Sequence, residues 1–196
     1  MDTATPDLRP ATERVATLLD GITDDLLDAP TPCPDYAVRE LLGHLSGLSV
    51  AFRDAARKDF GPTTDTSPEA ALPSLDDGWR TTLPRLLDEL AAAWREPGAW
   101  QGTTRAGGVT LPGEVAGLVA LNEVVLHGWD LARATGQGYA PDEASLRVSY
   151  ALLAPTADAT REDEPFGPAV TVPDGAPLLD RVIGLSGRRP DWRPGR

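Results

Sequence analysis

The feature that most constrains the fold of this chain is the stretch LNEVVLHGWDLARATGQ at residues 121–137. It forms the second half of a predicted helix over about residues 113–135, whose other faces are apolar. One stripe of this helix carries Glu123, His127 and Asp130, bracketed by small residues. Spacings of four and three residues place these side chains on one face, about a turn apart. The stretch therefore predicts a core helix that carries potential metal ligands into a helical bundle.

Apolar residues recur at intervals of three and four in several other segments, which predicts a helix in each. The predicted helices cover about residues 12–27, 38–57, 79–94 and 144–154, and a last short helix starts at about residue 177. Asp35 is the predicted N-cap of the second helix. A polar, proline-rich connection at residues 59–74 is a candidate lid, and a short hairpin is predicted within residues 100–111. This order of elements predicts an all-α protein, a helical bundle with one long crossover loop.

Composition restricts the partners that the chain is expected to bind. The 196 residues are 41% hydrophobic, which is enough for the core of one domain. The formal net charge is −12 and no basic run offsets it, so nucleic acid is not an expected partner. No charged and apolar leader opens the sequence, and no apolar run approaches about 18 residues, so we expect no membrane span and a cytoplasmic protein. The single cysteine, Cys33, excludes an intramolecular disulfide.

The chain contains only two histidines, His44 and His127, and both fall within apolar helical patterns. Glu123 lies four residues before His127, so the two side chains can share one ion. If the bundle brings His44 beside them, two imidazoles and one carboxylate form a metal site of the open, catalytic type. The alternative is that His44 is a hydrogen-bonded core residue and that Glu123 pairs with an arginine. Spacing alone leaves both open, because Glu-x-x-x-His occurs often by chance.

Two motifs carry a resemblance to a known family: TPCPDYAVRELLGHL at residues 31–45 and LNEVVLHGWDLARATGQ at residues 121–137. With these motifs the chain resembles the DinB/YfiT-like superfamily. More closely, it resembles the actinobacterial branch that contains the metal-binding domain of mycothiol-dependent maleylpyruvate isomerase. The resemblance implies a DinB-like, up-down-down-up four-helix bundle with a small C-terminal extension. It also implies that the metal ligands of the family, a His, a Glu and a His, correspond to His44, Glu123 and His127.

The resemblance implies a function and a division of the chain as well. A divalent metal, zinc with nickel or iron as alternatives, would keep a low-molecular-weight thiol such as mycothiol as the thiolate that adds to an electrophilic small molecule. The implied partners are this thiol, the electrophile and a second copy of the chain in a homodimer. One alternative is a non-enzymatic metal-binding protein with a stress or metal-handling role, and another is a bundle without metal. The metal-binding bundle is assigned to residues 1–156 and a proline-rich extension with a short helix packed on it to residues 157–196.

Several residues near the motifs have more than one interpretation. Asp130 has three possible roles: a fourth metal ligand, a partner of Arg133, or an acceptor for the second ring N–H of His127. We prefer the last, because a histidine that binds a metal usually donates its other N–H to an acceptor. Cys33 lies near the start of a helix, where the helix dipole would favour a thiolate. The alternative is a packed small side chain, which is the commoner case for a lone cysteine. Arg105 and Arg133 are candidates for anchoring an anionic substrate, although a solvated arginine is the commoner case.

Overall fold

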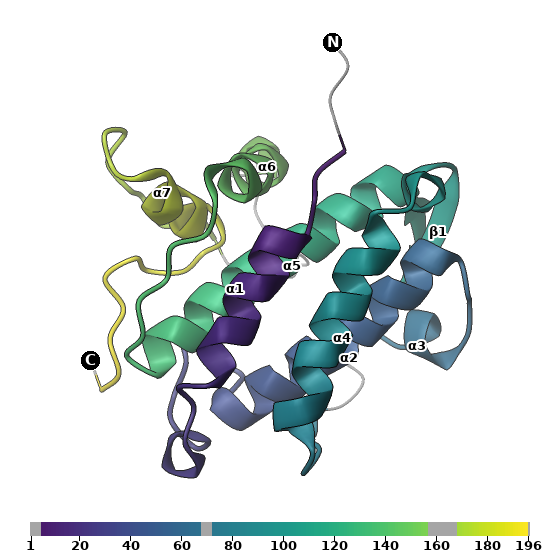
Figure 1. Cartoon of the computed structure of the whole chain (residues 1–196). Helices are drawn as coiled ribbons and strands as arrows, with labels where there is room; N and C mark the ends of the chain where they lie inside the picture. The colour runs from purple at the N-terminus through teal and green to yellow at the C-terminus, as the bar shows by residue number, and fades with distance from the viewer. Residues whose placement is uncertain (1–4, 68–71, 157–167, 196) are drawn as a thin grey trace.

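Four helices of the computed structural model, which describes residues 5–67, 72–156 and 168–195, pack side by side as a bundle (Figure 1). They are α1 (Arg9–Leu19), α2 (Val38–Arg57), α4 (Trp79–Trp94) and α5 (Gly113–Ala134). Both α1 and α2 contact α4 and α5. Helices α1 and α5 run in one direction and α2 and α4 in the other (Figure 1), which confirms the predicted all-α, up-down-down-up bundle.

The connection between α2 and α4 is long because these two neighbours are parallel, so the chain must return along the bundle. It contains the one-turn helix α3 (Pro62–Asp65). The Thr63 hydroxyl donates to Asp54 Oδ2 at 2.8 Å, which ties α3 to the end of α2. The predicted crossover loop is therefore confirmed over its described part, which leaves out residues 68–71. Its role as a lid stays a prediction.

A two-stranded hairpin leads into α5, as predicted. The elements are the turn η3 (Pro97–Trp100), the strand β1 (Thr103–Ala106) and the antiparallel strand β2 (Val109–Pro112). Gly107 and Gly108 turn the chain with φ angles of 59° and 79°, which glycine adopts without a steric penalty. The N–H of Gly108 donates to the carbonyl of Thr64 at 2.9 Å. The hairpin is therefore fixed against α3 at the end of the bundle where α5 begins.

Helix α5 lies in contact with α1, α2 and α6, and its apolar residues form the centre of the core. A Cβ at Gly117 would lie within 2.8 Å of the rings of Trp94 and Trp100, so only glycine fits there. Among the described residues, α5 is the one helix whose length and mean hydropathy of 1.2 would suit a membrane span, but 78% of that window is buried inside the protein. Its apolar character is accounted for by its place in the core.

The first helix is shorter at its C-terminal end than its apolar period predicts. Helix α1 ends at Leu19 rather than at about residue 27. The chain turns at Gly21, whose N–H donates to the carbonyl of Leu18 at 3.1 Å, and then forms the separate turn η1 (Asp24–Leu26). Glycine is a poor helix former, so the apolar pattern continues across this turn while the helix does not.

The predicted N-cap of the second helix is wrong. Helix α2 begins at Val38, and its N-cap is the extended residue Ala37 rather than Asp35. Glu40 Oε2 accepts the N–H of Ala37 at 3.1 Å. A glutamate at this third position of a helix therefore satisfies a donor at the helix start, which a cap at Asp35 was expected to do.

The remaining helices lie on the side of the bundle formed by α5 (Figure 1). Helix α6 (Glu143–Leu153) packs against α5 and is followed by the turn η4 (Ala154–Thr156), and helix α7 (Leu178–Leu185) packs against α6. After α7 the chain returns to α5, where Arg133 donates to the carbonyl of Pro190 at 2.5 Å. The short C-terminal helix is thus present. The domain boundary between residues 156 and 157 stays a prediction, and residues 157–167 lie outside the described part.

Candidate metal centre

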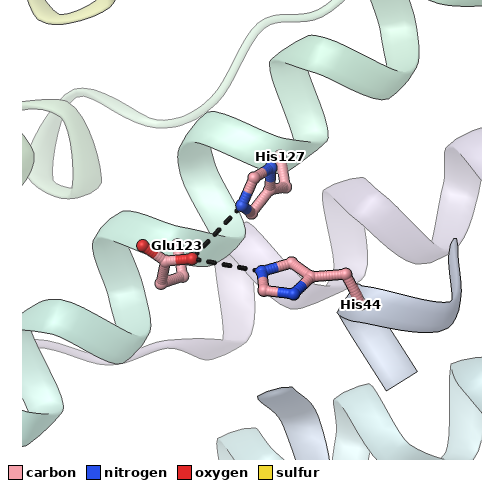
Figure 2. Close-up of side chains that lie close together, drawn as sticks. All are labelled: His44, Glu123 and His127. Carbon is pink, nitrogen blue, oxygen red and sulfur yellow. Dashed lines mark ion pairs between the residues drawn. The ribbon is translucent and has the colours of Figure 1, made fainter. Parts of the chain in front are cut away.

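The three predicted ligands lie together between α2 and α5 (Figure 2). Glu123 and His127 project from α5, and His44 projects from α2. Glu123 Oε2 lies 3.2 Å from His127 Nε2 and 3.5 Å from His44 Nε2. One carboxylate oxygen therefore faces two ring nitrogens, and the contact between the two helices brings in the histidine that spacing alone could not place.

The separations of Glu123 Oε2 from the two ring nitrogens suit a small divalent cation. The ligand atoms of the three residues all lie within 4.8 Å of one another. Tetrahedral zinc with bonds of about 2.0–2.2 Å sets neighbouring ligand atoms about 3.3–3.6 Å apart. The separations of 3.2 and 3.5 Å are close to that range. Two imidazoles with one carboxylate are also the donor set of open zinc sites, so the residues present fit the cation.

The cluster is enclosed by protein without being sealed from solvent. The side chains of His44 and Glu123 retain 14% and 16% of their exposure, and that of His127 retains 8%. Deep burial on most sides holds the three side chains in place. The residual exposure places the cluster at the edge of the protein interior, and an open coordination position would require access from this side.

Asp130 accepts from the other ring nitrogen of His127. Its Oδ2 lies 3.0 Å from His127 Nδ1, and its side chain is fully buried. An acceptor at Nδ1 keeps the proton there and leaves the Nε2 lone pair for a cation. The geometry favours the preferred interpretation of Asp130 over a pairing with Arg133, which instead lies over the ring of Trp129 at 5.4 Å.

Arg188 reaches the same carboxylate from the C-terminal segment. Its Nε donates to Asp130 Oδ1 at 2.7 Å, and its Nη2 donates to Oδ2 at 2.8 Å. The pair is bidentate, and the Arg188 side chain is only 11% exposed. Sequence reasoning missed this residue, because no period or motif spacing relates a position after α7 to the stripe on α5.

The loop before α2 places an aromatic ring on His44. The ring centroids of Tyr36 and His44 lie 5.2 Å apart with an interplanar angle of 35°. The loop is held by Thr31, whose hydroxyl donates to the carbonyl of Tyr36 at 2.7 Å and accepts the N–H of Cys33 at 3.1 Å. Tyr36 belongs to the first of the two family motifs, but nothing in the sequence indicated its contact with His44. The ring limits how far the His44 imidazole can turn.

Burial and neighbouring charges compete in setting the pKa values of the cluster. Burial alone would raise the pKa of Glu123, but hydrogen bonds from His127 and His44 hold it well below its ordinary value. Burial likewise opposes the raised pKa of His127, which results from Asp130 and Glu123. The pKa of Asp130 is lowered against burial by the charge of Arg188 and the bond to His127. Both carboxylates therefore stay ionised, as cation binding requires.

The other predicted candidates do not contribute activated groups to this cluster. Burial, with the nearby charge of Asp130, raises the pKa of Cys33 to about 11, so the helix dipole does not produce a thiolate there. This outcome favours the interpretation of Cys33 as a packed side chain. Arg105 donates to Asp65 Oδ1 at 2.8 Å beside the hairpin, so it is engaged away from the predicted role of a substrate anchor.

Comparisons with known proteins agree with the resemblance that the two sequence motifs indicate. A family model described as the mycothiol maleylpyruvate isomerase N-terminal domain matches residues 8–132. Two proteins of Mycobacterium tuberculosis described as uncharacterised, one from strain CDC 1551 / Oshkosh and one from strain ATCC 25618 / H37Rv, are each 26% identical over 183 residues. These matches cover 91% of this chain and 93% of the relative.

Solved structures share the fold over most of the chain. A crystal structure of the mycothiol-dependent maleylpyruvate isomerase has a TM-score of 0.65 and 22% identity, covering 94% of this chain and 88% of that chain. A histidine-to-alanine mutant of that enzyme gives a TM-score of 0.65 at 19% identity, covering 92% of this chain and 86% of that chain. The shared fold thus extends beyond the residues that the family model matches.

Proposed function

Since the chain belongs to the mycothiol maleylpyruvate isomerase N-terminal domain family, we propose that it is a thiol-dependent isomerase-like or S-transferase-like protein with a divalent metal site. The observation that carries this proposal is the convergence of His44, Glu123 and His127, whose ligand atoms lie within 4.8 Å of one another. The ion we propose is zinc, with nickel or iron as alternatives for the same donor set.

Each residue of the centre has a defined part in this proposal. His44 and His127 would donate Nε2 and Glu123 would donate Oε2. Asp130 retains the proton on Nδ1 of His127, and its own charge is balanced by Arg188. Only the charge of Glu123 then offsets a divalent cation, so the loaded site keeps one positive charge and suits one anionic ligand.

A thiol is the ligand that this charge balance and the family together support. A bound divalent cation would lower the pKa of such a thiol, so that the thiolate is present near neutral pH. We propose mycothiol as the thiol and a small molecule with an electron-poor carbon as its partner, in a cytoplasmic protein that forms a homodimer. The fold likeness to mycothiol-dependent maleylpyruvate isomerase supports the thiol and leaves the electrophile open.

A second candidate is a metal-binding protein without catalysis. Its support is that the polar groups beside the three ligands are already engaged. Asp130 is bound by His127 and Arg188, and the thiol of Cys33 has a pKa of about 11. Neither group is poised to transfer a proton at neutral pH. In this case the metal would serve a stress or metal-handling role.

The test is metal analysis of protein purified without a metal-affinity tag, followed by turnover assays with mycothiol and an electrophilic probe such as chlorodinitrobenzene. The variants are His44→Ala, Glu123→Ala and His127→Ala. Glu143→Ala is the matched control, because this glutamate is 71% exposed on α6 and pairs with the equally exposed Arg147. Circular dichroism checks that each variant keeps its helical content.

Each outcome separates the candidates. About one equivalent of metal in the wild type and the control, lost in the three ligand variants together with thiol-dependent turnover, supports the enzyme. Metal that is lost in the same variants without turnover in the wild type supports the binding protein. A wild type that neither contains nor takes up metal contradicts both, and His44, Glu123 and His127 are then a structural polar network.

A further inference from the structure

We infer that Arg188 is a positioning residue of the metal centre, acting through Asp130 on His127. The inference rests on the proposed metal site and extends it to the C-terminal segment. Arg188 lies 58 residues beyond Asp130 in the sequence, yet both of its contacts to that carboxylate are shorter than 3 Å, at 2.7 and 2.8 Å. It therefore brings a distant part of the chain to within one residue of a ligand.

The geometry gives Arg188 control over the orientation of Asp130. Two parallel N–H bonds from one guanidinium fix the plane of a carboxylate as well as its position. The same Oδ2 atom then accepts from His127 Nδ1 at 3.0 Å. Because the imidazole is rigid, holding Nδ1 also sets the direction of Nε2, which lies 3.2 Å from Glu123 Oε2. The guanidinium thus orients Nε2 of His127 without contacting it.

Arg188 also balances the charge of Asp130. The Asp130 side chain has no solvent exposure, and burying a charged group is costly unless that group is paired and hydrogen-bonded. The guanidinium of Arg188 provides this partner through two hydrogen bonds, at 2.7 and 2.8 Å, and the pair is neutral as a whole. The loaded centre therefore keeps the single positive charge that suits an anionic ligand.

The segment that carries Arg188 is itself fixed to the protein at both sides. The N–H of Arg188 donates to the carbonyl of Ile183 at 3.2 Å, at the end of α7. Two residues later, the carbonyl of Pro190 accepts from Arg133 on α5 at 2.5 Å. These anchors hold the guanidinium at the centre without the help of a metal. The C-terminal segment thus completes the centre in addition to covering the bundle.

The test compares Arg188→Gln, Arg188→Lys, Asp130→Asn and the double variant Asp130→Asn/Arg188→Gln. Arg189→Gln is the matched control, because this neighbouring arginine is 71% exposed and pairs with the exposed Asp191. The readouts are zinc affinity by competition with a chelator and the visible absorption spectrum of the cobalt-loaded protein. The spectrum reports the geometry of the ligands and does not depend on turnover or on a known substrate.

We expect Arg188→Gln to weaken zinc binding about 10–100-fold, as loss of a partner behind a metal ligand does. The cobalt spectrum shifts in the same variant, and Arg188→Lys recovers only part of the affinity because an ammonium cannot bind in a bidentate manner. The double variant should bind no more weakly than Asp130→Asn alone, because both substitutions break one relay. Arg189→Gln should match the wild type.

Two results would overturn the inference separately from the proposed function. If Arg188→Gln has the zinc affinity and the cobalt spectrum of the wild type while His127→Ala still loses the metal, the metal site stands and Arg188 has no positioning role. If the wild type binds no metal, the proposed metal site and the role of Arg188 are both contradicted. If Arg188→Gln does not fold, Arg188→Lys decides, because it keeps the buried charge and loses only the bidentate geometry. Equal affinity and an unchanged spectrum in that variant then contradict the inference.

Discussion

The imidazole rings of His44 and His127 meet edge to face, with centroids 4.7 Å apart and planes at 80°. Glu123 Oε2 faces both rings, at 3.2 Å from His127 Nε2 and 3.5 Å from His44 Nε2. A divalent cation bound to these three atoms would be held by two neutral rings and one carboxylate, because an imidazole nitrogen that binds a metal carries no proton.

Zinc is therefore expected to stabilise the folded chain. A ligand that binds only the native state at 100 times its Kd adds about 2.7 kcal/mol. For a chain of this size, that gain corresponds to a rise in Tm of about 5–10 °C. Thermal unfolding followed by circular dichroism, with and without excess zinc after treatment with a chelator, measures the rise. In His44→Ala and His127→Ala the zinc-induced rise should vanish, and a similar rise in these variants would place the bound ion elsewhere.

The sequence supports different parts of this centre to different degrees. Glu123, His127 and Asp130 lie within eight positions on one helix, so the helical period alone predicts that they share a face. His44 lies on another helix, and its place followed from the resemblance and from the packing of α2 against α5. The contact of Arg188 could not be predicted, because it depends on how the chain after α7 returns to α5. Periodicity contains no information about such a return.

Apolar spacing predicted the positions of the helices better than the residues at which they end. The spacing predicted where α2 and α4 lie, because each of these helices buries one continuous face, and where α5 lies, because it is buried on nearly all sides. It extended α1 too far, because Ile22 and Leu26 pack against the same core from a turn that is no longer helical. A pattern of apolar residues reports burial, and burial does not stop where helical hydrogen bonds stop.

The pH dependence of stability should differ between the metal-free and the zinc-loaded protein. In the metal-free protein the pKa of His127 is raised, so its stabilisation is complete below about pH 6.5 and is lost as pH rises through the folded pKa. The pKa values of Glu123 and Asp130 are lowered, so their stabilisation is present above about pH 4 and is lost as pH falls. Stability should therefore be highest between about pH 5 and 6.5.

With excess zinc the alkaline limb of this profile should reverse. Zinc binds the deprotonated rings, so its affinity and the stability that it adds rise from about pH 5 to pH 7.5. Urea unfolding at a series of pH values, with chelator or with zinc, measures both profiles. His127→Gln should flatten the fall above pH 6.5 in the metal-free protein. Stability that rises above pH 6.5 in the presence of chelator would contradict the shift assigned to His127.

Two glycines of α2 provide a matched test of the packing beside His44. A Cβ at Gly43 would lie 2.8 Å from the backbone carbonyl of Ser74, whereas nothing lies within 4 Å of a Cβ at Gly47. We expect Gly43→Ala to destabilise the protein by about 1–3 kcal/mol, because a backbone atom cannot move aside easily. Gly47→Ala should stabilise it by about 0.5–1 kcal/mol through helix propensity. Urea unfolding measures both, and equal effects at the two sites would show that the segment before α4 does not press on α2.

The thiol of Cys33 should be unreactive in the folded protein. Burial and the charge of Asp130 raise its pKa to about 11, so at pH 8 the thiolate fraction is about 100-fold smaller than for a thiol of pKa 9. Alkylation by iodoacetamide, followed by mass spectrometry, should therefore be at least about 10-fold slower in native protein than in urea. Cys33→Ser, which should show no labelling, is the control. If the native protein reacts as fast as the unfolded chain, Cys33 is activated after all. It would then be a candidate nucleophile beside Arg188, whose charge acts on the same thiol.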